Sequence, residues 1–194
     1  MNRALDIAIA GTGLVLSSPL YALGALAVKL EDRGPVLYKQ KRVGKDGRDF
    51  EILKLRTMVP QAETMGAGFA VDKGDSRITR AGALLRRLSL DELPQLWNVV
   101  RGDMSLIGPR PTLRYQVDRY DERQLHRLDV KPGITGWAQI HGRASLSWAD
   151  RIALDLWYVE NRSPAIDLKI LLRTPLALFG GTYKGETGGW HAPQ

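Results

Sequence analysis

The 194-residue chain contains no cysteine and only three histidines. Without cysteine, disulfide bonds and thiolate metal sites are excluded. His126, His141 and His191 lie far apart, so the chain has no ligand spacing such as H-E-x-x-H. An internal repeat is also absent. We therefore expect one domain, or one domain with an appendage, with enough residues for a sizeable core.

Negative charge is scarce relative to positive charge. The 28 lysines and arginines exceed the 21 aspartates and glutamates, which gives a formal net charge of +7 and a pI near 9.8. This balance predicts an anionic partner. Nucleic acid, anionic lipid and a phosphorylated substrate all satisfy that prediction.

Charge is wholly missing from residues 7–28. About 20 apolar residues span a bilayer, so one interpretation is a transmembrane helix. Ala25-Leu26-Ala27 resembles a signal-peptidase site, so a cleaved signal is a second. The third is a bent, re-entrant helix broken at Ser18 and Pro19, since proline removes a backbone bond and a serine hydroxyl can satisfy the freed carbonyl. The basic residues around the stretch then place both ends in the cytoplasm.

The residues best suited to chemistry are concentrated in the segment 85–111, which contains the adjacent carboxylates Asp91 and Glu92. Ser89 and Glu92 have the spacing of a capping box, and Pro94 must lie near the start of the helix. A helix start would place Asp91 beside free N–H groups, where a carboxylate stays ionised and phosphate also binds. The simpler interpretation is that the pair only caps a helix.

Arginines around this pair indicate more than a cap. Four of them flank it in the sequence: Arg86, Arg87, Arg101 and Arg110. Gly108-Pro109-Arg110-Pro111 fixes the chain direction around Arg110, because each proline locks its own φ and restricts its predecessor. A rigidly held arginine beside carboxylates suits phosphate better than solvent.

Three segments, 88–99, 102–111 and 131–139, together resemble the bacterial sugar transferase family. Its members are monotopic phosphoglycosyl transferases that begin glycan assembly on a polyprenol phosphate, and the resemblance runs from about Arg3 to about Leu172. It favours the re-entrant helix, and it implies an enzyme on the cytoplasmic face of the bacterial inner membrane.

The resemblance also implies a reaction. Asp91 would attack the sugar-bearing phosphate of a UDP-sugar and release UMP, and the polyprenol (undecaprenyl) phosphate would then take the phosphosugar. Such transfer depends on positioning and charge neutralisation. Glu92 would be the ligand of Mg²⁺, which uses one or two carboxylates plus substrate phosphates. Lys54, Arg86 and Arg110 would bind substrate as fixed cations.

Two family motifs differ from the usual pattern. Lys54 begins K-L-R-T-M, which has leucine in place of the phenylalanine of K-F-R-T-M; the simpler interpretation of this lysine is a solvated edge strand. Arg143 is expected to bind substrate at the end of the segment 139–143, where His141 replaces the usual asparagine. Any hydrogen bond assigned to position 141 is therefore doubtful.

The fold class expected is α+β and mainly helical, with a re-entrant membrane helix, a small hairpin, and amphipathic or interface helices around a cytoplasmic active site. The divisions are residues 1–30 (membrane helix), 31–180 (catalytic domain) and 181–194 (tail). Asp46-Gly47 predicts a hairpin between 36–38 and 50–53. A loop is expected at 60–78, a turn at 131–137, and helices at 79–88, 114–128, 147–160 and 163–179. The last helix suits either the core or a membrane interface.

A different class of protein remains open. Residues 79–100 contain two short helices with a tight joint and several arginines, as in a membrane-tethered helix-turn-helix module that binds DNA. Against this, Pro94 lies at the front of the recognition helix, and candidate base-reading residues are sparse beyond Gln95 and Asn98. An anionic-lipid scaffold explains the charge but not the carboxylates. The partners expected are thus a UDP-sugar, polyprenol phosphate and membrane lipid, without nucleic acid; a homodimer is left open, and the sugar is not identified.

Overall fold

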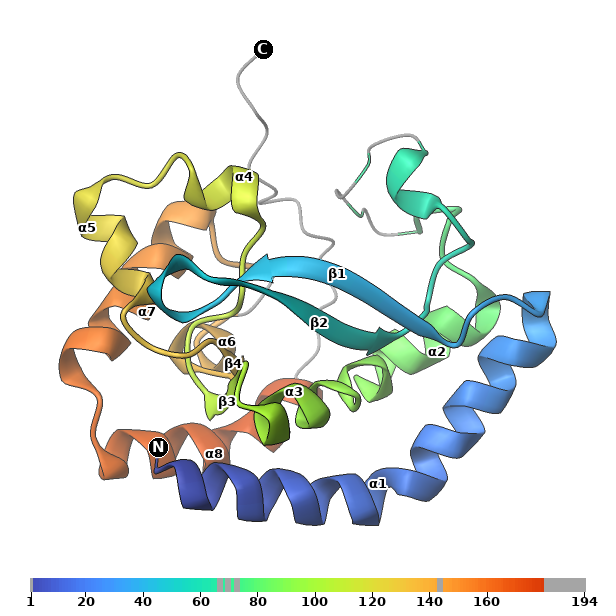
Figure 1. The fold of residues 1–194 in the computed structure, drawn as a ribbon, viewed down its shortest axis with the longest axis horizontal. Helices are drawn as coiled ribbons and strands as arrows, with labels where there is room; N and C mark the ends of the chain where they lie inside the picture. Colours follow the sequence, from blue (N-terminus) through green and yellow to red (C-terminus); the bar gives the residue numbers. More distant parts are fainter. Residues whose placement is uncertain (1, 66–67, 69–70, 72–73, 143–144, 180–194) are drawn as a thin grey trace.

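The structure is a computed structural model that describes residues 2–65, 68, 71, 74–142 and 145–179. Helices dominate it and are accompanied by two small sheets (Figure 1), which confirms the mainly helical α+β class. The elements are α1 (Arg3–Asp32), β1 (Leu37–Val43), η1 (Lys45–Gly47), β2 (Asp49–Leu55), η2 (Ala62–Thr64), α2 (Arg80–Arg87), η3 (Leu90–Glu92), α3 (Gln95–Arg101), β3 (Ser105–Ile107), α4 (Arg114–Val117), α5 (Glu122–Leu125), η4 (His126–Leu128), β4 (Gly133–Thr135), α6 (Trp137–Ile140), α7 (Trp148–Asn161) and α8 (Pro164–Phe179).

Helix α1 is the one helix in the described part of the chain that is long and apolar enough to cross a membrane. Figure 1 shows it as two arms that meet at a bend. Pro19 lies inside the helix and cannot donate to the carbonyl of Val15, four residues earlier. The Ser18 hydroxyl donates to that carbonyl instead, at 2.7 Å. The expected compensation of the proline break is therefore present.

The first end of α1 is bound to the rest of the protein by polar side chains. Arg3 donates to the carbonyls of Val99 and Val100, at the C-terminal end of α3. Asp6 is buried and accepts hydrogen bonds from the Ser105 hydroxyl and the Leu106 N–H. These contacts anchor the helix start to α3 and β3.

The other end of α1 is anchored in the same way. Glu31 accepts hydrogen bonds from the backbone N–H groups of Arg80 and Ala81, in the first turn of α2. Asp32 forms a two-point ion pair with Arg56, just beyond β2. Both ends of the apolar helix are thus attached to the same domain.

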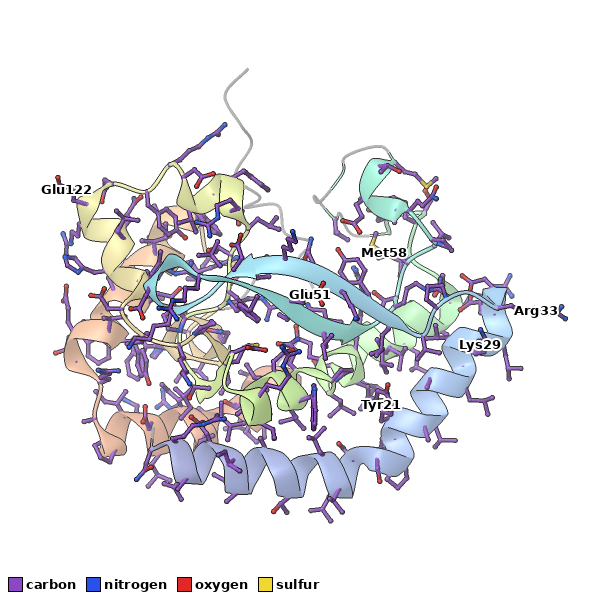
Figure 2. The ribbon with its side chains drawn as sticks, viewed as in Figure 1. Tyr21, Lys29, Arg33, Glu51, Met58 and Glu122 are labelled. Carbon is purple, nitrogen blue, oxygen red and sulfur yellow. The ribbon has the colours of Figure 1, made fainter. Side chains whose placement is uncertain are left out.

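Strands β1 and β2 form the predicted hairpin, with Leu37 opposite Leu55 and Val43 opposite Asp49. Asp46 and Gly47 both have positive φ, 57° and 72°, which is the backbone that an Asp-Gly turn provides. Lys54 belongs to β2, and the hairpin lies beside α3 in Figure 1 and Figure 2.

The predicted turn at 131–137 is wrong in one respect, because it contains β4, which pairs in parallel with β3. The glycines of this segment allow two stretches of backbone to lie close together, in addition to allowing the chain to turn. A Cβ on Gly133 would lie 2.1 Å from the nitrogen of Gly108. The Gly133 N–H donates to the carbonyl of Pro109, so the two segments 108–111 and 131–137 are joined backbone to backbone.

The predicted helix at 114–128 is also wrong, since the segment breaks into α4, α5 and η4. The Asp121 side chain accepts from the N–H of Gln124, and the Gln124 side chain accepts from the N–H of Asp121. This reciprocal capping begins a new helix at α5. The capping box therefore interrupts the single helix that the amphipathic pattern predicted.

The last two helices were predicted correctly. Ser147 caps α7, accepting from the N–H of Asp150, and Pro164 is the first residue of α8. Helix α8 has two apolar faces. Ile170 is fully buried in the main core, whereas three leucines one turn apart are exposed: Leu168, Leu172 and Leu176. The expectations of core and of interface thus each describe one face. The tail expected at 181–194 lies outside the described residues.

Candidate active site

The Asp91–Glu92 pair lies on the short helix η3, between α2 and α3. The predicted capping box is wrong: Ser89 makes no side-chain cap and has a left-handed φ of 55°. Pro94 directly precedes α3, as its missing N–H requires. The two carboxylates therefore do not cap a helix, and Glu92 instead binds residues distant in the sequence.

Glu92 is held by two cations. Its Oε1 accepts from Lys54 Nζ at 3.2 Å and from Arg110 Nη2 at 2.6 Å. Burial alone would raise the pKa of Glu92, but the charges and hydrogen bonds of Arg110 and Lys54 outweigh it and hold that pKa well below its usual value. Burial in turn lowers the pKa of Lys54, although Glu92 opposes that effect. Glu92 is thus a fixed, ionised carboxylate.

Asp91 differs from its neighbour. It is 8% exposed, and within the described ranges it has no hydrogen bond or ion pair. Burial, reinforced by the charge of Glu92, raises the pKa of Asp91 to about 6, although Lys54, Arg86 and Arg110 favour ionisation. At neutral pH this carboxylate is mostly charged, and its oxygens are not committed to another side chain.

The sequence-predicted cations divide into two groups. Lys54 and Arg110 meet at Glu92, and Arg86, on α2, donates from Nε to Thr57 Oγ1 at 2.8 Å while contributing positive charge near Asp91. By contrast, Arg87 is exposed, and Arg101 lies near Asp103 at the far end of α3. Thr57, which positions Arg86, was not predicted, although it lies in the K-L-R-T-M segment.

A second cluster holds the backbone of the Arg110 segment. Arg127 donates to the carbonyl of Arg110 at 2.6 Å, to Asp155 at 2.7 Å and to the Tyr120 hydroxyl at 2.8 Å. Arg127 and Asp155 are 3% and 1% exposed. This pair was missed from the sequence, because nothing local links η4 to α7.

No group of three or more His, Cys, Asp or Glu side chains suited to a metal ion occurs within the described ranges. Asp91 and Glu92 still fit Mg²⁺ as a pair, because that ion takes one or two carboxylates and completes its shell with water and substrate phosphates. Only Oε1 of Glu92 is engaged by Lys54 and Arg110. A cation would thus have Asp91 and the second oxygen of Glu92 as donors.

A recognition helix for DNA is not present at residues 79–100. Gln95 and Asn98, the candidate base readers, are 1% and 0% exposed. Asn98 bonds the edge of β2 instead, accepting from the Leu53 N–H and donating to the Glu51 carbonyl. Helix α3 is therefore packed between α1 and β2, and it presents no base-reading face.

Two predicted positions remain. Arg143 lies outside the described residues. His141 is exposed, its Nδ1 is 2.8 Å from the carbonyl of Trp137, and its ring lies 4.2 Å from the Trp137 ring. In this structure the unusual histidine therefore packs on its own helix.

The sequence profile of the bacterial sugar transferase family matches residues 1–181. The chain belongs to this family. It is 44% identical to a Bacillus subtilis protein described as the uncharacterized sugar transferase EpsL, over 90% of the chain and 85% of that protein. The resemblance predicted from the three motifs is thus confirmed.

Two further relatives have more specific descriptions. A Caulobacter vibrioides UDP-glucose:undecaprenyl-phosphate glucose-1-phosphate transferase is 46% identical, over 92% of the chain and 69% of the relative. An Aeromonas hydrophila UDP-N-acetylgalactosamine-undecaprenyl-phosphate N-acetylgalactosaminephosphotransferase is 45% identical over 93% of the chain. The chain spans 44% of the length of the Aeromonas protein.

Proposed function

We propose that this protein transfers a sugar 1-phosphate from a UDP-sugar to undecaprenyl phosphate and releases UMP, through a covalent intermediate on Asp91. The two relatives described above are named for this type of reaction with different sugars. The observation that carries the mechanism is the contrast within one dipeptide: Glu92 is bound by two cations, whereas Asp91 is buried, charged and without a partner in the described chain.

In the first step, a carboxylate oxygen of Asp91 attacks the sugar-bearing phosphorus. The P–O bond to UMP breaks, and UMP leaves with the electron pair, so an acyl phosphate remains on Asp91. In the second step, an oxygen of the polyprenol phosphate attacks the same phosphorus. The bond to Asp91 breaks, which regenerates the carboxylate and yields a polyprenol diphosphate sugar. No net proton is required in either step.

The surrounding residues provide positioning and charge. Arg110 and Lys54 are held by Glu92 at the edge of the site, where their positive charge can neutralise the phosphate oxygens. Arg86 is positioned by Thr57 near Asp91.

Mg²⁺, bound by Glu92 and Asp91 together with the diphosphate, would add Lewis-acid charge neutralisation. Removal of the ion with EDTA should abolish UMP release and added Mg²⁺ should restore it; activity that ignores the chelator would contradict the metal assignment.

The docking of α1 supports a re-entrant topology. Arg3 and Asp6 bind α3 and β3, and Glu31 and Asp32 bind α2 and Arg56. A straight transmembrane span would place these two ends on opposite sides of the bilayer. The bend at Pro19 lets both ends reach one domain, which the basic flanks place in the cytoplasm.

Exposed apolar side chains support a membrane-facing surface on this side of the molecule. Helices α1, α2, α3 and α8 lie on the side of the hairpin away from α4 and α5 in Figure 1. Besides the outer face of α1, they expose large apolar residues: Leu84, Leu88, Trp97, Leu168, Leu172 and Leu176. A surface of this kind suits insertion into a bilayer interface, where an acceptor phosphate also lies.

The reaction is tested by incubating the detergent-solubilised protein with undecaprenyl phosphate, Mg²⁺ and a panel of UDP-sugars. UMP release with at least one sugar is expected, together with a phosphosugar adduct on Asp91 detected by mass spectrometry when the acceptor is omitted. Turnover that requires donor and acceptor to be bound together, without any adduct, would contradict the covalent mechanism.

The topology is tested with a cysteine added at the N-terminus, since the chain has none of its own. In intact cells an impermeant thiol reagent should miss this cysteine in the parent. It should label the variant in which Ser18 and Pro19 are both leucine, because a straight helix would cross the bilayer. Labelling of the parent would show a spanning helix, and loss of the cysteine would show cleavage near Ala25-Leu26-Ala27.

A further inference from the structure

A pocket of about 190 Å³ lies beside the catalytic dipeptide. Glu92 and Arg110 line it together with the apolar side chains of Leu93, Leu96 and Ile134. Whole small-molecule ligands usually occupy about 300–1,000 Å³. An apolar cavity of about 150 Å³ is already large enough for a benzene ring. The pocket therefore suits one ring of a substrate rather than an entire nucleotide sugar.

Gln139, on α6, also lines this pocket and carries an unusual feature. Both polar atoms of its side-chain amide, Oε1 and Nε2, are buried and have no hydrogen-bond partner among the described residues. An unpaired buried polar group costs roughly 1–3 kcal/mol. No hydrogen bond from the described residues offsets this cost, which points to a bond that forms only when a ligand is bound.

Backbone contacts hold Gln139 close to the Arg110 segment. A Cβ on Gly136, the residue before α6, would lie 2.2 Å from the Gly108 carbonyl and 2.9 Å from Oε1 of Gln139. The start of α6 is thus pressed against the first residue of Gly108-Pro109-Arg110-Pro111. A ligand ring bonded to Gln139 would consequently lie in a pocket that Arg110 also lines.

The chemistry of the lining distinguishes three candidate occupants. A polyprenol chain would suit Leu93, Leu96 and Ile134 but would leave the Gln139 amide unpaired. A sugar could pair with the amide and with Ser89, Thr135 and Thr174, which also line the pocket, but it lacks flat apolar faces for the leucine and isoleucine side chains. A pyrimidine base presents flat apolar faces and, at its edge, a donor beside an acceptor. The side-chain amide of glutamine has the complementary pair of groups.

We propose that Gln139 is the residue that binds the uracil edge of the nucleotide donor, accepting from the imide N–H and donating to an adjacent carbonyl. This inference rests on the proposed function, because it takes UDP-sugar as the donor. It makes Gln139 a residue for nucleotide recognition, separate from Asp91, which performs the transfer.

The test is UMP binding, measured by calorimetry on the full-length protein in detergent. Gln139→Leu should weaken UMP binding about 10- to 100-fold, the loss of two hydrogen bonds. The KM for the UDP-sugar should rise by a similar factor, with kcat reduced less. Gln139→Glu, which loses the donor, should also weaken binding. Gln95→Met is the matched control, because it removes another buried glutamine amide that does not line the pocket, and UMP binding should be unchanged.

The outcomes separate this inference from the proposed function. If the parent releases UMP but Gln139→Leu binds UMP as tightly as the parent does, the inference is overturned and the function stands. A changed preference among UDP-sugars with unchanged UMP binding would assign Gln139 to the sugar. A changed KM for undecaprenyl phosphate alone would assign Gln139 to the lipid. Either result overturns the inference. A parent that releases no UMP from any UDP-sugar overturns both, and a parent that releases UMP without binding it overturns the inference alone. Folding is checked by thermal melting, in which Gln139→Leu should match or exceed the parent.

Discussion

Two clusters of buried charge meet at one short segment, 108–111, and they are built differently. The Arg127–Asp155 cluster pairs one cation with one anion, and Arg127 donates to Asp155, to the Tyr120 hydroxyl and to the Arg110 carbonyl. The cluster around Asp91 and Glu92 places two adjacent carboxylates among several cations and leaves Asp91 without a hydrogen bond or ion pair in the part that the structure describes. Arg110 joins them, since its carbonyl binds the first cluster and its side chain binds the second.

The difference separates charge that stabilises from charge that reacts. A buried ion pair with satisfied hydrogen bonds holds the backbone in one position, and breaking it leaves an uncompensated charge. A buried carboxylate without a partner is costly to the fold and is retained where reactivity requires it. The comparison therefore predicts opposite consequences for removing an acid from each cluster.

The largest effect is expected for Asp91→Asn. Transfer should fall by more than about 1,000-fold, because the amide cannot form the acyl phosphate. The melting temperature at pH 8 should rise, since the variant no longer buries an unpaired charge. Both are measured on the same preparation, by UMP release and by thermal unfolding. Turnover within tenfold of the parent would remove Asp91 as the nucleophile.

The opposite result is expected for Asp155→Asn, which leaves Arg127 without a counter-charge. The free energy of unfolding should fall by about 3–5 kcal/mol. The double variant Arg127→Met with Asp155→Leu should recover much of this stability. It should remain a poor enzyme, because the Arg110 carbonyl has lost its donor. A fully active double variant would show that the cluster does not position Arg110.

An intermediate effect is expected for Arg110→Lys. The charge remains, but lysine cannot hold Glu92 and a phosphate with a planar fork, so kcat/KM should fall about 10- to 100-fold. Arg101→Lys is the control, because Arg101 is exposed and lies near Asp103, away from the dipeptide. Equal activity in both variants would make the role of Arg110 structural.

The smallest effect is expected from pH. The ordinary pKa of Asp91 is 3.8 and burial raises it to about 6, so kcat/KM should fall about tenfold between pH 8 and pH 5 as Asp91 takes up its proton. Between these two pKa values the folded state binds more protons than the unfolded state. Stability should therefore decrease as pH rises through this window, on the order of 3 kcal/mol in total. That stability change should be absent in Asp91→Asn.

The features predicted from sequence were those with local causes. Ser18 and Pro19 together determine the break in α1. Asp46-Gly47 determines the hairpin turn, and Ser147 with Asp150 begins α7. The strand β4 was missed because its partner is β3, and its pairing cannot be deduced from the Lys-Pro-Gly punctuation alone.

The candidate site shows the same division. The residues Asp91, Glu92, Lys54 and Arg110 were identified from their motifs, and the structure brings them together. Which carboxylate stays free was not predictable, because it depends on a strand 38 residues away placing Lys54 on Glu92. A role for Gln139 was likewise not predictable from sequence, because it depends on the packing that leaves the side-chain amide buried without a hydrogen-bond partner among the described residues.

The attachment of both α1 ends to one domain bears on where this protein can work. A helix that crosses a bilayer must match its hydrocarbon thickness, and mismatch sorts such proteins between membranes. Under the proposed topology α1 samples one leaflet only, so that constraint does not apply. The height of Asp91 above the lipid is instead set within the protein, by the fixed distance between the bend and the anchored ends. Membranes of different thickness should therefore present the acceptor phosphate to Asp91 at the same level.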